Sequence, residues 1–230
     1  MTTPNPDQPA PLEIAPVERS HDAARQAYDR MARVYDLMAA PFEGPHTRRM
    51  VELLKITPAE AVLDVGFGTG DVLCELAERV GPDGRVAGVD ISPAMRDVAM
   101  EKLRRLDLGD GVDLQVADAC SLPFDDDSFD VACISFTLEL FSVDEMQQVL
   151  GECRRVLQPT GRLGVTAMSN HDRTAMARIY EWLRRYFPAY MDCRPIPVDT
   201  VVQNRHFHVV ERERSSMAMI PVSIIVARPR

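Results

Sequence analysis

The stretch VLDVGFGTGD, residues 62–71, places Gly66, Gly68 and Gly70 at alternate positions directly after a β-branched apolar run. A buried strand, a glycine-rich turn and a helix together form the first unit of a nucleotide-binding α/β sheet. Glycine there permits a tight turn and lets a ligand approach the backbone N–H groups at the start of the helix. The alternative is a strand-to-helix turn that holds no ligand. The predicted strand before the loop and helix after it favour a binding loop.

Two acidic residues narrow the choice of ligand. The loop reads G-x-G-x-G, whereas the dinucleotide fingerprint is G-x-G-x-x-G. Asp90 ends the next predicted strand, 20 residues after Gly70, where a carboxylate accepts the hydroxyls of a ribose. Asp64 precedes the loop, where a negative charge suits an ammonium group better than a pyrophosphate. These acids favour a ligand with an adenosine and a positively charged tail, and S-adenosylmethionine has both.

Outward from the loop, strands and helices alternate. Periodicity predicts helices over 71–80, 93–106 and 142–157, and strands over 61–65, 85–90, 112–117, 129–136 and 162–168. Ser142 and Glu145 form a capping box at the start of the third helix. Strands joined by helix-length segments need crossover connections, so this sheet is mostly parallel with helices on both faces.

The two ends of the chain break this alternation. Residues 1–17 hold five prolines and predict a disordered tail. An apolar stripe from Ser20 predicts a helix that ends near Pro41, and a second helix should follow Pro45, with Met50, Val51 and Leu54 inward, and stop before Pro58. A helix over 171–186 precedes two strands, 206–212 and 222–227, whose close spacing predicts an antiparallel pair at the sheet edge.

The predicted fold is therefore α/β, a doubly wound, mostly parallel seven-stranded sheet with an antiparallel edge hairpin. We expect a single domain over 18–230 after the tail of 1–17, since 230 residues suit one hydrophobic core. Its parts are N-terminal cap helices over 18–57, a cofactor-binding core over 58–168 and an acceptor-side C-terminal part over 169–230.

Composition excludes several classes of function. A net charge of −9 disfavours nucleic acid as a partner. No apolar run is long enough to span a bilayer, and the N-terminus does not resemble a secretory signal. The five cysteines include no CxxC pair, so we expect reduced thiols and a cytoplasmic protein. The acids at 125–127 are typical of a solvated turn, and no metal site is assigned.

Four ordered motifs carry a family resemblance: VLDVGFGTGD, VAGVDISPAM, ADACSLPF with DSFD, and RVLQPTGRL. They resemble the motifs of class I S-adenosylmethionine-dependent methyltransferases, especially the ubiquinone/menaquinone C-methyltransferase branch. The resemblance runs from about Tyr28 to Met168 and implies a Rossmann-like fold with S-adenosyl-L-methionine as the cofactor. It also implies that the residues of the first motif that hold the methionine portion are Asp64, Gly66, Gly68, Thr69 and Gly70.

The same resemblance assigns the rest of the cofactor site. Asp90 would hold the ribose, Asp118 and Ala119 the adenine edge, and Ser135 would lie beside the cofactor. Tyr28, with Tyr35, would belong to a helix that covers the pocket. Two alternatives stay open. Asp118 could be a plain strand-end cap, and the two tyrosines lie on an apolar helix stripe where core packing is as good an explanation.

The sulfonium of such a cofactor already makes its methyl group electrophilic, so the protein has to align a nucleophile in line and exclude water. A general base helps where the acceptor carries a proton. The base candidates are Glu139, at the carboxyl end of the fourth strand, and His171, after the fifth; His206 and His208 are weaker. Glu139 could equally be a surface acid.

The acceptor side departs from the family. The related quinone C-methyltransferases read Gly-Leu-Arg-Asn where this chain reads TLEL at 137–140. This change argues against a quinone precursor and favours a cationic or amine acceptor. The segment 186–198, rich in aromatic residues and proline, predicts a wall of the acceptor pocket or a packed connector.

The sequence thus predicts methyl transfer to a small, hydrophobic or amphipathic molecule. Two alternatives remain: a regulator or scaffold that binds the cofactor without turnover, and an NAD-dependent oxidoreductase, which the glycine spacing disfavours.

Overall fold

The computed structural model describes residues 40–170, 194–203, 206–217 and 220–230, together with Ile14, Arg25, Gln26, 28–30 and Ala32. The predicted helix over 171–186, with His171, lies outside the described residues, as do Tyr35 and the predicted tail apart from Ile14.

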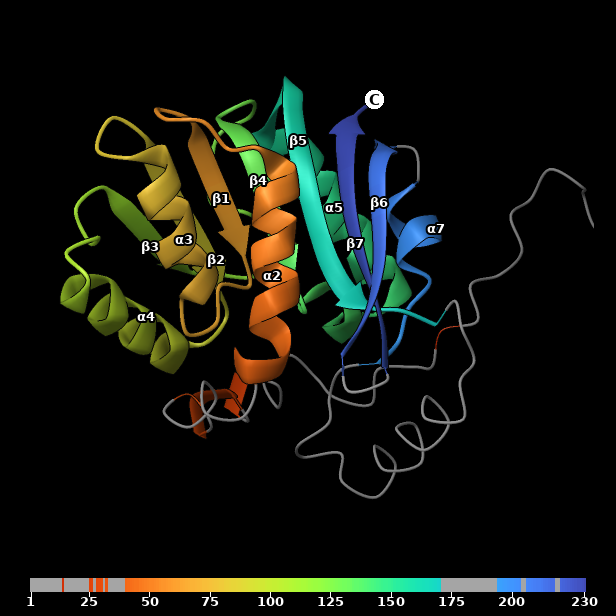
Figure 1. The fold of residues 1–230 in the computed structure, drawn as a ribbon, viewed down its shortest axis with the longest axis horizontal. Helices are drawn as coiled ribbons and strands as arrows, with labels where there is room; N and C mark the ends of the chain where they lie inside the picture. Colours follow the sequence, from red (N-terminus) through yellow and green to blue (C-terminus); the bar gives the residue numbers. More distant parts are fainter. Residues whose placement is uncertain are drawn as a thin grey trace, which may run out of the picture.

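Seven strands form one sheet in the order β3-β2-β1-β4-β5-β7-β6 (Figure 1). The first five pair in parallel, β7 pairs antiparallel with β5, and β6 pairs antiparallel with β7 at the edge. The predicted α/β fold with an antiparallel edge hairpin is confirmed. The strand bounds are β1 (Ala61–Val65), β2 (Arg85–Asp90), β3 (Val112–Val116), β4 (Phe129–Ser135), β5 (Leu157–Met168), β6 (Phe207–Met217) and β7 (Ile220–Pro229).

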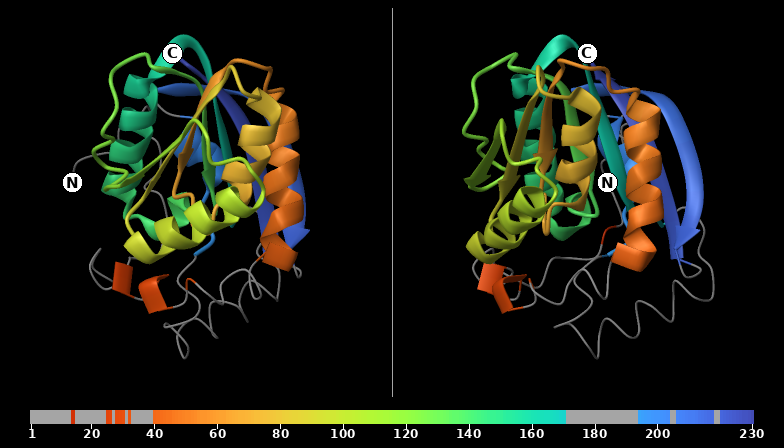
Figure 2. Two further views of the ribbon diagram at one scale, coloured as in Figure 1. Left: turned by 90° about the vertical axis from the view of Figure 1, so that its left-hand side faces the viewer. Right: turned by 60° about the vertical axis from the view of Figure 1, so that its left-hand side comes forward.

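Helices cover both faces of the sheet. On one face lie α2 (Ala40–Leu54), α3 (Asp71–Val80) and α4 (Pro93–Arg105), and on the other α5 (Val143–Val156) and α7 (Val198–Val202). The left view of Figure 2 shows the sheet between α5 on one side and α2 with α3 on the other. Each face has its own apolar cluster, because alternate strand residues point to opposite sides. On the first face, for example, Val62 packs with Leu73 and Met50.

The helix α2 corrects one prediction. It begins at Ala40, so Pro45 lies inside it instead of ahead of it. A proline within a helix costs one hydrogen bond and crowds the preceding turn. Burial offsets this cost, because Met50, Val51 and Leu54 are at most 1% exposed, as predicted. The helix α2 packs closely on the sheet at Gly164 of β5. A Cβ at this position would lie only 2.7 Å from the side chain of Leu54.

Arg162 of β5 closes the C-terminal end of α2. Its guanidinium donates to the carbonyl oxygens of Leu54 and Lys55 and forms an ion pair with Glu60 at 2.8 Å. A cation at this end satisfies carbonyl groups that have no partner within the helix.

The strand β5 starts earlier than the pattern predicts. The chain passes from α5 directly into β5 at Leu157, whereas the pattern predicts a strand that starts only at residue 162. Leu157 pairs with Phe129 of β4 and Arg162 pairs with Val131, so the register shifts between these pairs and the extra residues lie in β5. The edge strands β6 and β7 are likewise longer than predicted, because their hairpin pairing continues to Met217 and Ile220.

Candidate active site

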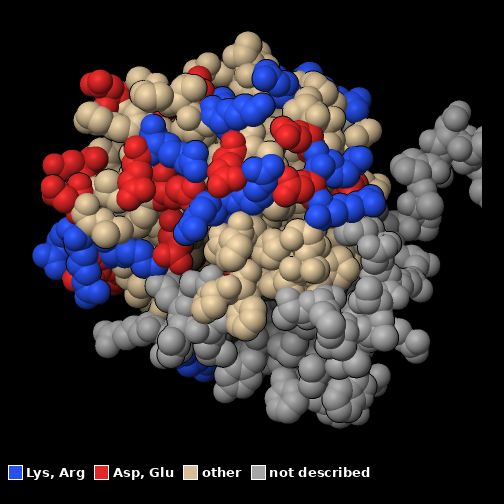
Figure 3. All heavy atoms as spheres, in the orientation of Figure 1, with Lys and Arg blue, Asp and Glu red and all other residues tan. Residues whose placement is uncertain are grey.

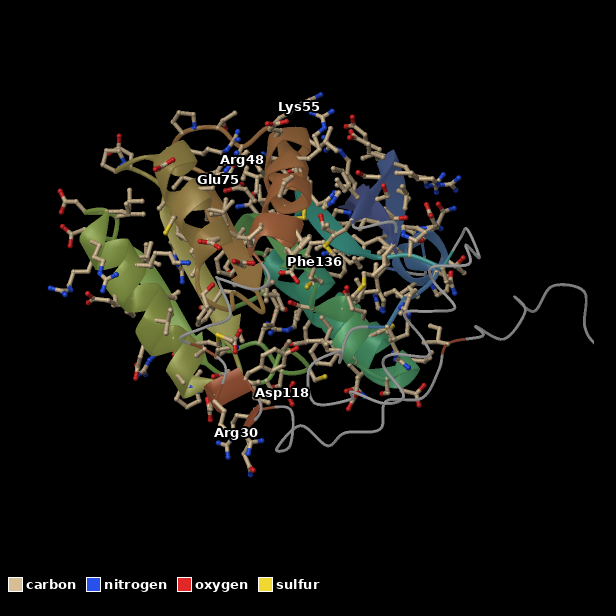
Figure 4. The ribbon with its side chains drawn as sticks, turned by 60° about the horizontal axis from the view of Figure 1, so that its bottom comes forward. Arg30, Arg48, Lys55, Glu75, Asp118 and Phe136 are labelled. Atoms are coloured by element: carbon tan, nitrogen blue, oxygen red, sulfur yellow. The ribbon has the colours of Figure 1, made fainter. Side chains whose placement is uncertain are left out.

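A cavity of about 870 Å³ opens at the carboxyl ends of β1, β2 and β4. The strand order reverses between β1 and β4, and open α/β sheets bind ligands at such a switch point. In Figure 4, Asp118 lies at one end of the cavity, Arg48 and Glu75 lie at the other, and Phe136 lies between them. The predicted site residues that line it are Tyr28, Gly66, Gly68, Thr69, Asp90, Asp118, Ala119 and Ser135.

The three loop glycines have different structural roles. All have positive φ angles, of 78° at Gly66, 52° at Gly68 and 88° at Gly70. A Cβ on Gly66 would lie 2.4 Å from the side chain of Thr137, and one on Gly70 would lie 2.8 Å from Ala99 of α4. A Cβ on Gly68 would meet nothing within 4 Å, so this glycine leaves open space beside the cavity. Gly70 does not line the cavity and instead permits α4 to pack closely.

Asp90 lines the cavity and also braces the glycine loop. Its carboxylate accepts a hydrogen bond of 2.9 Å from the N–H of Gly68 and another of 2.9 Å from the N–H of Ser92. Burial raises the pKa of Asp90, and the two backbone N–H groups oppose this by favouring the charged form. The side chain expected to hold the ribose is therefore fixed in orientation by the loop beside it.

Asp64 lies beneath the loop on β1 and does not line the cavity. The side chain is completely buried, and within the described residues neither carboxylate oxygen has a hydrogen-bond partner. Burial raises its pKa to about 8, and the negative charge of Asp90 adds to this effect. An unpaired buried carboxyl group is costly, so a nearby cation would find a strong partner here.

Asp118, which Figure 4 labels, and Ala119 follow β3 and line the cavity. One carboxylate oxygen of Asp118 accepts from the N–H of Cys120 at 2.9 Å. The side chain thus caps the turn, as the alternative interpretation held, and at the same time faces the cavity.

The end of β4 carries hydroxyl groups toward α2. The Oγ of Ser135 lies 2.8 Å from the Oγ1 of Thr47, and Thr137 Oγ1 donates to the carbonyl oxygen of Ser135 at 2.9 Å. Phe136 between them has a φ of 47°, a left-handed conformation that bulky residues rarely adopt. Such strain occurs often at binding sites.

Tyr28 lines the cavity from the N-terminal part of the chain. The neighbouring Asp29 accepts a short hydrogen bond of 2.5 Å from the Oγ of Ser92 and a longer one of 3.4 Å from the N–H of Ala94. Ser92 is the N-cap of α4, directly after the Asp90 loop. The segment that carries Tyr28 is therefore held against the same corner of the sheet that carries Asp90.

Glu139 does not reach the cavity. It lies in the short 3-10 helix Leu138–Leu140, completely buried, and its Oε1 accepts from the N–H of Met168 at 3.1 Å. Arg194, itself 3% exposed, donates to the carbonyl oxygens of Glu139 and Phe141. Burial raises the pKa of Glu139 to about 8. The side chain is thus a buried group behind the cavity wall, which neither the base role nor the surface-acid alternative anticipated.

Sequence reasoning missed the apolar walls. Two of the residues in these walls could have been found in the sequence, because each lies inside a motif that was already recognised. Phe67 lies between two glycines of the loop, and Ile91 directly follows Asp90. The predicted cap over 18–57 includes α2, but its cavity-lining residues Thr47 and Arg48 were missed, because their contact with the cavity depends on tertiary packing. The apolar lining residues missed are Phe67, Val72, Val89, Ile91, Met95, Phe136, Leu140 and Phe141.

The described residues contain no group of three or more His, Cys, Asp or Glu side chains that could hold a metal ion. Among the same residues, no helix has the length and apolarity needed to cross a membrane. Figure 3 shows basic and acidic side chains interleaved over the face that carries α2 and α3. That face therefore presents no single basic patch.

Comparison with known proteins agrees with this geometry. A family described as a methyltransferase domain matches residues 62–161. A demethylmenaquinone methyltransferase of Lactobacillus johnsonii is 31% identical over 175 residues, which cover 76% of this chain and 71% of that protein.

Two solved structures share the fold. The cyclase SpnF matches with a TM-score of 0.76 at 18% identity, covering 95% of this chain and 98% of that one. The 1,6-didemethyltoxoflavin-N1-methyltransferase of Burkholderia thailandensis, solved with S-adenosylhomocysteine, matches with a TM-score of 0.68 at 20% identity over 96% of both chains. From the relative, the matched domain and the glycine-loop cavity, we conclude that the chain belongs to the class I S-adenosylmethionine-dependent methyltransferases.

Proposed function

We propose that this methyltransferase moves the methyl group of S-adenosylmethionine, by in-line displacement, to a hydrophobic or amphipathic small molecule held in the cavity. One observation carries the proposal. The open side of Gly68, the carboxylate of Asp90 and the turn at Asp118 all face the same cavity at the switch point of the sheet. This arrangement suits an elongated ligand with an adenosine at one end and an amino acid at the other.

The residues present fit the cofactor. Asp90 would accept from the ribose hydroxyls, and Asp118 with Ala119 would meet the adenine edge, with Ile91 as an apolar neighbour. Gly66, Gly68 and Thr69 would surround the methionine portion, with Gly70 shaping the loop from behind. Asp64 would act from beneath the loop, because its buried carboxyl group, which has no hydrogen-bond partner among the described residues, favours a positive charge nearby. When bound, the cofactor supplies the electrophilic methyl group.

The acceptor would occupy the part of the cavity beside Phe136, Leu140 and Phe141, which supply apolar surface there. Arg48 of α2 would supply a polar group. This mixture supports an amphipathic acceptor. Tyr28, held in place through Asp29, would help to exclude water from the reacting groups.

The proposal assigns no general base. His171 lies outside the described residues, and the carboxyl group of Glu139 faces β5 behind the cavity wall. Because its carboxyl group faces away from the cavity, Glu139 places no negative charge beside the acceptor. The replacement of the family's Gly-Leu-Arg-Asn by TLEL still removes a cation from that side. The Lactobacillus johnsonii relative is named for a quinone acceptor, and the Burkholderia thailandensis neighbour for a ring nitrogen. A quinone-type acceptor and an amine are thus the two classes to test first.

The cytoplasm remains our proposed location. Cys74, Cys120, Cys133 and Cys153 are free thiols, three of them buried, which supports a reducing compartment.

The test uses the full chain with S-adenosylmethionine labelled in its methyl group and a small-molecule extract of cells. We expect label to appear in a product of low molecular mass, and excess S-adenosylhomocysteine to suppress it. The same incubation with Gly68→Ala, whose Cβ would project into the open space by the loop, is the control. Tight binding of S-adenosylhomocysteine without any labelled product would instead support the cofactor-binding regulator or scaffold.

A further inference from the structure

Three hydroxyl groups meet where β4 ends under α2. They belong to Thr47, Ser135 and Thr137, and all three residues line the cavity. Thr137 Oγ1 donates to the carbonyl oxygen of Ser135 at 2.9 Å and lies 3.3 Å from the carbonyl oxygen of Gly66. The group is therefore directly beside the first glycine of the loop, where the proposed function puts the amino-acid end of the cofactor.

Only one set of directions satisfies both hydrogen bonds of Thr47. Thr47 has one hydroxyl hydrogen and a carbonyl oxygen can only accept, so the 3.1 Å contact with the carbonyl oxygen of Glu43, one turn earlier in α2, requires Thr47 to donate there. The 2.8 Å contact between Thr47 and Ser135 then needs a hydrogen from Ser135. Ser135 is left with lone pairs and no hydrogen to offer to the cavity. It can accept from a ligand, but it cannot donate.

The surroundings also favour a donor ligand with positive charge. The carbonyl oxygens of Gly66 and Ser135 lie beside the three hydroxyl groups. Carbonyl oxygens accept hydrogen bonds, and an ammonium group offers three hydrogens and no lone pair.

We propose that Thr47 is a positioning residue, which holds Ser135 as a hydrogen-bond acceptor for the ammonium group of the cofactor's amino-acid portion. The inference rests on the proposed function, because it takes the bound ligand to be S-adenosylmethionine or its product. It adds a role for α2, which none of the cofactor motifs in the sequence includes.

The experiment compares two ligands by isothermal titration of the full chain. One ligand is S-adenosylhomocysteine, and the other is its desamino analogue, in which hydrogen replaces the amino group. The variants are Thr47→Val, which keeps the side-chain shape without the hydroxyl, Thr47→Ser, which restores the hydroxyl, and Ser135→Ala. The matched control is Thr166→Val on the neighbouring strand. Thr166 is the register partner of Ser135, and its buried Oγ1 has no hydrogen-bond partner among the described residues.

We expect Ser135→Ala to weaken binding of S-adenosylhomocysteine by roughly 10-fold or more, as for loss of a hydrogen bond to a charged group. Thr47→Val should weaken it by about 3- to 10-fold on the same scale. Neither should change the affinity of the desamino analogue, while Thr47→Ser and Thr166→Val should bind both ligands as the wild type does.

Two results would overturn the inference. Thr47→Val and Ser135→Ala could weaken both ligands equally, which would mark a general structural role, or could weaken neither. If Thr47→Val does not fold, as judged from its thermal unfolding, Thr47→Ala takes its place, and the same two outcomes apply. Failure of the proposed function looks different, since the wild type itself would then bind neither ligand.

Discussion

Replacing Glu139 with glutamine should stabilise the protein, and by an amount that grows with pH. Glutamine keeps an oxygen that accepts from the N–H of Met168, but it cannot ionise. Burial raises the pKa of Glu139 from its ordinary value of 4.5 to about 8. The backbone N–H groups of Glu139 and Met168 oppose this rise, Glu43 of α2 raises the pKa further, and Arg194 lowers it.

The sign of the effect follows from proton binding. Between pH 4.5 and 8 the folded protein keeps a proton on Glu139 that the unfolded chain has lost. The stability of the wild type therefore falls as pH rises through this range, and the loss is complete above pH 8. At 1.36 kcal/mol for each pKa unit, the rise from 4.5 to about 8 amounts to about 5 kcal/mol.

Urea unfolding of the wild type and Glu139→Gln at pH 4.5, 6, 7.5 and 9 measures this difference. We expect the free energies of unfolding to be similar at the lowest pH and to separate by several kcal/mol at the highest. Glu78→Gln, at an exposed position on α3, should show no such separation. A constant difference across the whole range would refute the reasoning. It would mean that water reaches Glu139 and that the side chain is ionised in the native state, which would restore it as a base candidate.

Three further predictions concern the loop, the N-terminal segment and α2. Gly68→Ala should reduce binding of S-adenosylhomocysteine at least 10-fold in a titration while costing only about 1–2 kcal/mol of stability. Its φ is 52°, and its Cβ would project into open space by the loop; equal affinity would show that no ligand approaches there. Asp29→Ala should raise the dissociation rate of S-adenosylhomocysteine roughly 10-fold in stopped-flow measurements, because Asp29 loses its bonds to Ser92 and Ala94. An unchanged dissociation rate would show that the segment carrying Tyr28 does not control release of the ligand. Arg162→Ala should lower the free energy of unfolding by about 3 kcal/mol, since Glu60 and the end of α2 lose a largely buried partner; a loss below about 0.5 kcal/mol would contradict that role.

Most of the fold could be predicted from local sequence patterns. The loop glycines, the capping box at Ser142 and the strand-helix alternation are each decided by neighbours in the sequence, and the structure agrees with them. Pro45 shows the limit of such patterns. A proline normally marks a helix start, but the apolar face of α2 gains enough burial on β5 and β7 for the helix to include it.

The site divides in the same way. Asp90 could be predicted because the end of the strand after a glycine loop faces the ligand crevice in this class of sheet. The contact between Thr47 and Ser135 could not, since 88 residues separate them and only the packing of α2 on the sheet joins them. Glu139 shows a third case. Its position at a strand end was predicted correctly, but the direction of its side chain depends on the 3-10 turn that follows and on Arg194, 55 residues later.

Titration of S-adenosylhomocysteine into the wild type and into Asp90→Ala tests the central claim most directly. Asp90 should accept from the ribose within the cavity, so its removal should weaken binding by about 1–3 kcal/mol in a variant that still unfolds cooperatively. Equal affinity of a folded Asp90→Ala variant, or a wild type that binds NAD and not S-adenosylhomocysteine, would contradict the account.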